Sequence, residues 1–268
     1  MTTYAIVHGA GGSGWDWRLV AAELQARGHD VVAPDLPCED DGAGLAAYTD
    51  TVVQAVERAG VGRDRLVVVG HSLGGFTAPH VAARLGADHL ALAAAMVPRP
   101  GETGSEWWEA SGYQAAMRAM KAGTEDDTRR PSAATADGEP GAAADDDEPG
   151  AAADDGEHPS RIQEAEGEAW VVETFFHDVE PHLAAEALRR TRKQTMTVMT
   201  EPWPLAAWPD VATSFVLFRD DRFFPAVFLR AMVRERLGLT AAEVPGGHCA
   251  YLSQPKELAG WLAAVPSR

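Results

Sequence analysis

A serine stands at the centre of a Gly-x-Ser-x-Gly motif, residues 70–74, directly after a short apolar run. Leu66 to Val69 are four apolar residues, three of them β-branched, which is typical of a buried strand. Phe76 to Leu85 then favours a helix despite its early proline. A strand, a tight turn and a helix hold a serine hydroxyl above a sheet, where free N–H groups at the helix start can stabilise an anion. This context predicts that Ser72 is a nucleophile, although the motif alone would also suit an ordinary glycine-rich turn.

A serine hydroxyl is a weak nucleophile and needs a base, which in turn needs an acid to orient it. His248 lies in a glycine turn after the last predicted strand, 239–244, and is the predicted base. Asp220 and Asp221 both follow an earlier strand. The chain order Ser, Asp, His is therefore the one expected of a hydrolase whose serine stands on such a strand–turn–helix, a nucleophile elbow. Adjacent side chains on a loop point in different directions, so only one of the two aspartates should reach His248. We favour Asp221 and leave Asp220 as the alternative.

Predicted strands and helices alternate along the chain. This alternation predicts an α/β protein with a mostly parallel sheet and helices on both faces. The predicted strands are 3–7, 31–33, 66–69, 89–97, 211–218 and 239–244, and the predicted helices are about 17–27 with Asp16 as its cap, 45–59, 76–85, 181–193, 226–237 and 255–265.

The glycine-rich loop after the first strand has two readings. Gly9, Gly11 and Gly14 meet the spacing of a dinucleotide-binding fingerprint, and Asp35 is a candidate for its ribose-binding acid. In an elbow hydrolase, however, the same loop supplies a second N–H to the oxyanion. We favour the role in a hydrolase over nucleotide binding, because the predicted nucleophile elbow at Ser72 already explains why a glycine-rich loop follows the first strand.

Residues 101–209 interrupt this alternation, so we predict a core of 1–100 and 210–268 with 101–209 inserted as a lid. The acidic stretch 123–159 has no large apolar residue and predicts a disordered, solvated loop, with a metal or partner site as the alternative. The aromatic residues of the insertion either line a substrate pocket or pack the insertion's own core. They are Trp107, Trp108, Tyr113, Trp170, Phe175, Phe176 and Trp203.

The sequence resembles the α/β-hydrolase superfamily, and within it the branch of methylesterase-like and hydroxynitrile-lyase-like proteins. The motifs that carry the resemblance are Val7-His8-Gly9-Ala10, Trp15-Asp16-Trp17, Gly28-His29-Asp30-Val31, Ala33-Pro34-Asp35-Leu36-Pro37, Gly70-His71-Ser72-Leu73-Gly74-Gly75, Asp221-x-x-x-Pro225 and Gly246-Gly247-His248. The resemblance implies an α/β-hydrolase fold, Asp221 as the acid, and the N–H groups of Ala10 and Leu73 as the oxyanion hole. It also implies hydrolysis of carboxylic esters through an acyl-enzyme, without a metal or organic cofactor. We expect small to medium hydrophobic substrates, with Trp107, Trp108, Phe176 and Trp203 as pocket residues.

Other activities use the same residues. Thioester and carbon–carbon bond hydrolysis need the same triad, and a ligand-binding protein of low turnover can keep the fold. The similar lyases carry Thr and Lys where this chain has Gly9 and Cys249, which disfavours lyase chemistry.

Charge and composition restrict the partners and the compartment. The net charge is −17, and residues 123–159 hold twelve acidic residues against two arginines. Such a charge argues against nucleic acid or an anionic membrane as a partner. Two cysteines and no evident signal peptide or membrane-spanning run are typical of a cytoplasmic protein. The oligomeric state is left open.

Replacing residues 123–159 with a short Gly/Ser linker should leave both the melting temperature and the rate of ester hydrolysis nearly unchanged, because a solvated loop adds little buried surface. Thermal unfolding and an ester assay of the shortened protein test this. A large loss of either would mean that the segment docks on the rest of the protein.

Overall fold

A computed structural model of the protein describes residues 1–60, 64–119 and 167–266, and the acidic stretch 123–159 lies outside these ranges. Its centre is one six-stranded, wholly parallel sheet in the order β2-β1-β3-β4-β5-β6. The strands are β1 (Thr3–Val7), β2 (Asp30–Val32), β3 (Leu66–His71), β4 (His89–Ala93), β5 (Ala212–Phe218) and β6 (Ala242–Val244). The predicted α/β fold with a parallel sheet is confirmed.

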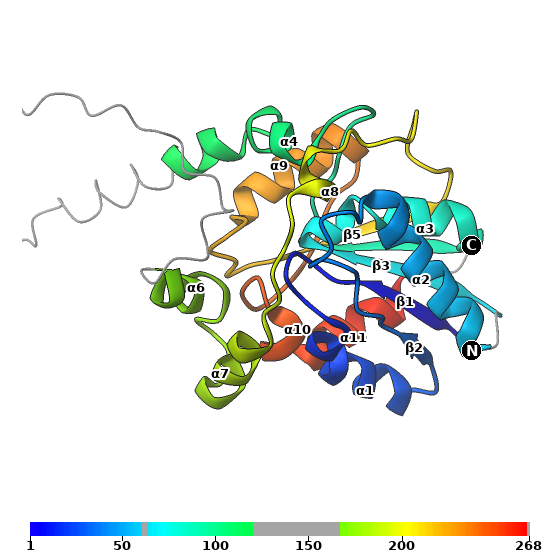
Figure 1. The fold of residues 1–268 in the computed structure, drawn as a ribbon. Coiled ribbons are helices and arrows are strands. Elements are labelled where there is room, and N and C mark those ends of the chain that lie inside the picture. The colour runs from blue at the N-terminus through cyan, green and yellow to red at the C-terminus, as the bar shows by residue number, and fades with distance from the viewer. Residues whose placement is uncertain (61–63, 120–166, 267–268) are drawn as a thin grey trace, which may run out of the picture.

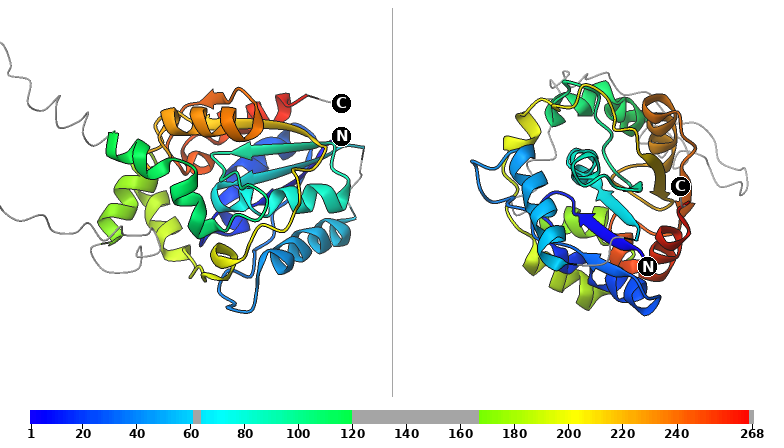
Figure 2. Two further views of the ribbon diagram at one scale, coloured as in Figure 1. Left: turned by 90° about the horizontal axis from the view of Figure 1, so that it is seen from above. Right: turned by 90° about the vertical axis from the view of Figure 1, so that its right-hand side faces the viewer.

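Helices cover both faces of this sheet (Figures 1 and 2). The helices outside the predicted insertion are α1 (Arg18–Ala26), α2 (Leu45–Ala59), α3 (Ala78–Leu85), α9 (Ala226–Leu237), α10 (Ala250–Ser253) and α11 (Pro255–Ala264), the last two of which follow β6. Two short 3-10 helices are η1 (Gly14–Trp17) and η2 (Ser72–Gly75). The pair α1 and α11 packs on one face of the sheet, and the pair α2 and α3 packs on the other. Among the described residues, no helix is both long and apolar enough to cross a membrane.

The three central strands are apolar on both faces because helices cover both faces. Every residue of β1, β3 and β4 is buried, which explains why the sequence shows continuous apolar runs there and no alternation. Strand order reverses between β1 and β3, since the chain runs outward from β1 to β2 and then returns to start β3. At such a switch point the loops after two neighbouring strands part and leave a crevice. The loop after β1 and the turn after β3 border this crevice, because Val7 and Gly70, at the ends of the two strands, are paired.

Several predicted boundaries are wrong by a few residues. The run 89–97 is a strand only to Ala93, since Ala94 has a φ of +41° and turns the chain. The helix predicted from Phe76 starts at Ala78, after the 3-10 turn η2. Asp16 does not cap the helix from outside: it lies inside η1, and its carboxylate accepts the N–H of Ser13 at 2.7 Å.

The helices between β4 and β5 all fall within the predicted insertion, and they gather at the end of the sheet opposite to both chain termini (Figure 1). They are α4 (Gly104–Ala110), a helical stretch at 113–119, α6 (Gly167–Phe175), α7 (Pro181–Arg190) and α8 (Thr197–Thr200). The carboxyl ends of the parallel strands point the same way, so these helices lie over the strand ends. The division into a core and a lid stays a prediction.

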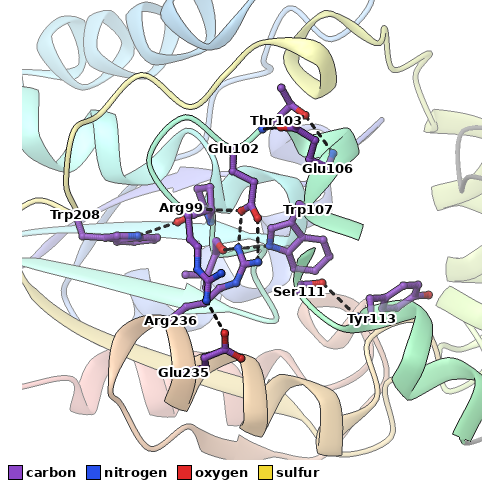
Figure 3. Close-up of polar contacts among 12 residues, drawn as sticks. Arg99, Glu102, Thr103, Glu106, Trp107, Ser111, Tyr113, Trp208, Glu235 and Arg236 are labelled. Atoms are coloured by element: carbon purple, nitrogen blue, oxygen red, sulfur yellow. Dashed lines mark hydrogen bonds and ion pairs between the residues drawn. The ribbon is translucent and has the colours of Figure 1, made fainter. Parts of the chain in front are cut away.

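A buried ion pair fastens the base of this insertion to the core (Figure 3). The Arg236 guanidinium of α9 bonds to Glu102 through two nitrogens, at 2.5 and 3.0 Å, and donates to the Val97 carbonyl at 2.7 Å. The two side chains are only 1% and 8% exposed. Glu102 also accepts the N–H of Arg99, and its backbone carbonyl accepts the N–H of Trp203 on the returning chain. The outgoing and returning segments of the insertion are therefore held at one point.

Glu102→Ala should lower the free energy of unfolding by about 3 to 5 kcal/mol, because it leaves the buried Arg236 charge without its partner. Urea unfolding measures the loss. The matched control is Glu235→Ala, which removes the exposed partner of Arg99 and should cost less than about 1 kcal/mol. Equal effects of the two substitutions would contradict the role given to the buried pair.

Candidate active site

Ser72 occupies the sharp turn between β3 and α3, and its backbone has a φ of +51°. Few residues other than glycine adopt this conformation, and here it is held by close packing on every side. A side chain on Gly74 would place its Cβ 2.4 Å from the Val7 carbonyl oxygen, and one on Gly75 would place it 2.0 Å from that of Met96. Only glycine fits at these two positions. The turn therefore presses against the ends of the neighbouring strands and holds the serine hydroxyl over the sheet.

The three side chains predicted as nucleophile, base and acid lie in one hydrogen-bonded row. His248 Nε2 is 3.0 Å from Ser72 Oγ, and His248 Nδ1 is 2.7 Å from Asp221 Oδ2. The other carboxylate oxygen of Asp221 accepts the N–H groups of Phe223 and Phe224, both at 2.8 Å. A carboxylate only accepts, so Nδ1 carries the proton and Nε2 is left to take one from the serine. All three side chains are buried.

Asp220, the alternative acid, has a different task. Its carboxylate accepts the N–H of Gly246 at 3.0 Å, and its own N–H donates to the Gly246 carbonyl at 3.0 Å. It thus ties the loop after β5 to the turn that holds His248. The two adjacent aspartates point to different partners, and Asp221 is the one that contacts the imidazole.

Ala10 and Leu73 both border the cavity in front of Ser72. Among the described residues, neither N–H has an acceptor, so both are available to an incoming oxygen. The loop lies close to the serine: a Cβ on Gly9 would be 3.0 Å from Ser72 Cβ. Oxyanion donors must lie within hydrogen-bond distance of the oxygen on which charge develops, and this role of Ala10 and Leu73 stays a prediction.

His8 fixes this loop from behind. Its Nδ1 donates to the Gly9 carbonyl at 2.8 Å, and its Nε2 accepts the N–H of Leu36 at 2.9 Å. Burial lowers the pKa of His8 to about 4, so the ring is neutral at pH 7 and keeps both bonds. Asp35, the candidate ribose-binding acid, accepts the N–H of Gly14 at 2.8 Å and so closes the same loop.

A layer of buried polar side chains supports the base. His71 Nε2 lies 3.1 Å from the carbonyl oxygen of His248, and burial holds the pKa of His71 well below its usual value. The Tyr251 hydroxyl donates to the sulfur of Cys249 at 3.1 Å. Burial raises the pKa of the Cys249 thiol, so this neighbour of the base remains protonated and does not compete as a nucleophile. None of these three residues was singled out as a functional residue, since their roles depend on contacts across the chain.

A cavity of about 1110 Å³ opens over the serine, and its walls come from the core loops and from the insertion. Trp108 and Phe176, two of the four residues predicted for the substrate pocket, line it, and so does Phe175. Phe175 and Phe223 make T-shaped contacts with the His248 imidazole, with ring centroids 5.4 and 5.1 Å from that of the imidazole. The sequence analysis did not identify Phe223, nor the further lining residues Leu188, Met196 and Met199. Phe223 falls on an unspecified position of the Asp221-x-x-x-Pro225 motif, and the other three residues belong to no motif.

For two of the four residues predicted to line the pocket, the predicted location is wrong. Trp107 and Trp203 do not border the cavity; both are fully buried in the packing between the insertion and the core. The indole N–H of Trp107 donates to the Val97 carbonyl at 3.1 Å, and that of Trp203 donates to the Phe76 carbonyl at 2.9 Å. An aromatic residue with a satisfied N–H and no free face is structural. Tyr113 and Trp170, also considered for the pocket, do not border it either.

Asp16 adds a carboxylate to the cavity wall. It is 9% exposed, and the one described hydrogen bond of its carboxylate comes from the N–H of Ser13. Burial raises the pKa of Asp16 to about 6, against which the Ser13 bond acts only in part. The sequence analysis treated this residue as a helix cap and missed its place in the wall.

A parallel sheet whose central strand ends in a sharp turn that carries a serine is the architecture of the α/β-hydrolase class. A family model described as the alpha/beta hydrolase family matches residues 6–261, and the chain belongs to this family. Polyneuridine aldehyde esterase has a similar structure, with a TM-score of 0.70, 17% identity and 99% coverage of both chains. A pyrethroid hydrolase from Sphingobium faniae JZ-2 follows with a TM-score of 0.63, 20% identity and coverage of 98% of this chain and 96% of that one. At these identities the likeness concerns the fold.

Curated relatives match over a shorter region. The chain is 41% identical over 81 residues to the probable esterase PIR7A of Oryza sativa subsp. indica, and 32% identical over 82 residues to methylesterase 7 of Arabidopsis thaliana. Each match covers 28% of this chain and 30% or 32% of the relative, so the chain matches about a third of the length of these proteins. The predicted resemblance to the methylesterase-like branch is confirmed, while the activity of the whole protein is a matter for proposal.

Asp16→Asn should stabilise the protein increasingly as the pH rises. The unfolded aspartate loses its proton near pH 3.8 and the folded one near pH 6, so the stability supported by the protonated form is present below 3.8 and lost as the pH rises through 6. The amide stays neutral, so its advantage should grow to roughly 3 kcal/mol at most above pH 7. Urea unfolding of both proteins at pH 4.5, 6 and 7.5 measures it. A difference that does not vary with pH would contradict the burial argument.

Proposed function

We propose that the protein hydrolyses carboxylic esters through Ser72, His248 and Asp221. The observation that carries the proposal is the continuous row from hydroxyl to imidazole to buried carboxylate at the floor of a cavity. The names of the curated relatives, an esterase and a methylesterase, point to the same chemistry.

The reaction starts when His248 Nε2 takes the Ser72 proton and the hydroxyl oxygen attacks the ester carbonyl. Negative charge then develops on the carbonyl oxygen, where the N–H groups of Ala10 and Leu73 stabilise it. Asp221 holds the protonated imidazole through Nδ1 and supports its charge. His248 next gives its proton to the leaving alcohol, and the acyl group remains on Ser72. A water molecule, activated in turn by His248, releases the acid and restores the serine.

The proposed substrates are uncharged, hydrophobic and of small to medium size. The cavity volume, about 1110 Å³, is at the upper end of what small-molecule sites have. The aromatic rings of Trp108, Phe175 and Phe223 line the cavity, the latter two beside His248, and would contact an apolar acyl or alcohol part. Thioesters fit the same machinery and belong in the first substrate panel.

Ser72→Ala should abolish turnover of p-nitrophenyl esters of graded chain length, because no other described group takes the place of the hydroxyl. Asp221→Asn should lower kcat by about 10⁴-fold, since it loses the anion that orients and supports the imidazole. Asp220→Asn is the matched control and should lower kcat less than about tenfold, since Asn can still accept the Gly246 N–H. A wild-type rate no higher than that of Ser72→Ala, together with no labelling by a fluorophosphonate, would overturn the esterase proposal.

A further inference from the structure

Two polar residues of the inserted region, His177 and Asp178, lie in the turn between α6 and α7 and contact both loops that carry the triad partners of the serine. We name residues 219–225 after β5 the acid loop and residues 245–249 after β6 the base loop. We propose that His177 and Asp178 are positioning residues, which hold the acid loop and the base loop in place relative to each other. The inference rests on the proposed function, and it assigns to the insertion a part in catalysis beyond covering the cavity.

Asp178 holds the base loop by its backbone. Its Oδ2 accepts the N–H of Gly247 at 2.8 Å and the hydroxyl of Ser253 at 2.7 Å. Gly247 directly precedes His248, and Ser253 ends α10, the helix that directly follows the base loop. One carboxylate oxygen thus joins the residue before the base to the helix after it. Hydrogen bonds to a charged acceptor are stronger than those between neutral groups, so this contact is a firm restraint on the position of the imidazole.

His177 holds the acid loop. Its Nε2 lies 2.9 Å from the carbonyl oxygen of Asp220, the residue directly before Asp221. A carbonyl only accepts, so Nε2 must carry a proton and donate. Asp220 is itself joined to Gly246 of the base loop by two hydrogen bonds. The contacts therefore close a ring from the insertion to the acid loop, on to the base loop and back to the insertion.

The base loop is shaped to fit this pair. A Cβ on Gly247 would lie 2.7 Å from His177 Cε1 and 2.8 Å from Asp178 Oδ1, so only glycine leaves room for the two side chains. The facing atoms, His177 Nδ1 and Asp178 Oδ1, are 3.6 Å apart, and both are buried without a hydrogen-bond partner among the described residues. Buried unpaired polar atoms cost stability. The other polar atom of each side chain, Asp178 Oδ2 and His177 Nε2, is the one that holds a loop.

Neither residue borders the cavity, and this separates a positioning role from a binding role. Loss of the restraint should move the imidazole relative to Ser72 Oγ and leave the substrate-contacting walls in place. A displacement of about 1 Å at reacting groups can cost about 100-fold in rate. The expected signature is thus a fall in kcat with little change in KM.

The test compares Asp178→Ala with Asp178→Asn, and uses Glu180→Ala as the control from the same turn, since Glu180 is exposed and no side-chain contact of it to either loop is described. We expect Asp178→Ala to lower kcat and the rate of fluorophosphonate labelling by about 10- to 100-fold, with KM changed less than about threefold. Asp178→Asn should restore most of both rates, because the amide oxygen can accept the Gly247 N–H. Glu180→Ala should equal the wild type. Rates for Asp178→Ala within about twofold of the wild type, or a change in KM alone, would overturn the inference.

A second readout does not depend on turnover. The proton between His248 Nδ1 and Asp221 should give a downfield proton NMR signal, assigned by its loss in Asp221→Asn. We expect this signal to shift or broaden in Asp178→Ala, and an unchanged signal would overturn the inference. If Asp178→Ala does not fold, the pair His177→Ala and His177→Gln replaces it, because Gln can still donate to the Asp220 carbonyl. Wild-type protein that neither labels nor hydrolyses esters would defeat the proposed function, whereas an active wild type with an equally active Asp178→Ala would defeat only the positioning role.

Discussion

The left-handed backbone of Ser72 is the constraint on which the site depends. A strand buried on both faces ends there, and the chain must turn at once into a helix without drawing its serine into the core. Gly74 and Gly75 make the turn possible, since neighbouring carbonyl oxygens fill the space that their side chains would need. The strain is therefore supported by the packing of the whole sheet around the turn. The hydroxyl is left exposed to the cavity while its backbone stays fixed.

The remaining parts of the site come from loops that meet at the same edge of the sheet. The loop after β1 supplies Ala10, and the loops after β5 and β6 supply Asp221 and His248. Parallel strands make this meeting possible because all their carboxyl ends point the same way. Polar residues then hold these loops: His8 holds the loop after β1, and Asp220 joins the loop after β5 to the loop after β6. The geometry of the site therefore depends on the side chains that hold these loops as well as on the side chains that border the cavity.

The inserted region is joined to the core at several points and is part of the site's construction. The buried Glu102–Arg236 pair fixes its base, and Trp107 and Trp203 fill the space between it and the core. On the other side, Arg192 donates its N–H to the carbonyl of Gly11 in the loop after β1. Sequence patterns alone placed these tryptophans in the pocket, because an aromatic residue in an insertion has the same composition signal whether it faces a ligand or a neighbouring helix.

The sequence by itself determined the fold class, the strained serine turn and the order of serine, aspartate and histidine, because each depends on local residue types and on short spacings. It also limited the candidates for the acid that orients His248 to two adjacent residues, Asp220 and Asp221. Only the tertiary structure decided that Asp221 contacts the imidazole while Asp220 bonds to Gly246, that Phe175 and Phe223 face the base, and that Asp16 lies in the cavity wall. These facts depend on which way a side chain points and on partners far away in the chain. Neither property leaves a periodic or compositional trace in a single sequence.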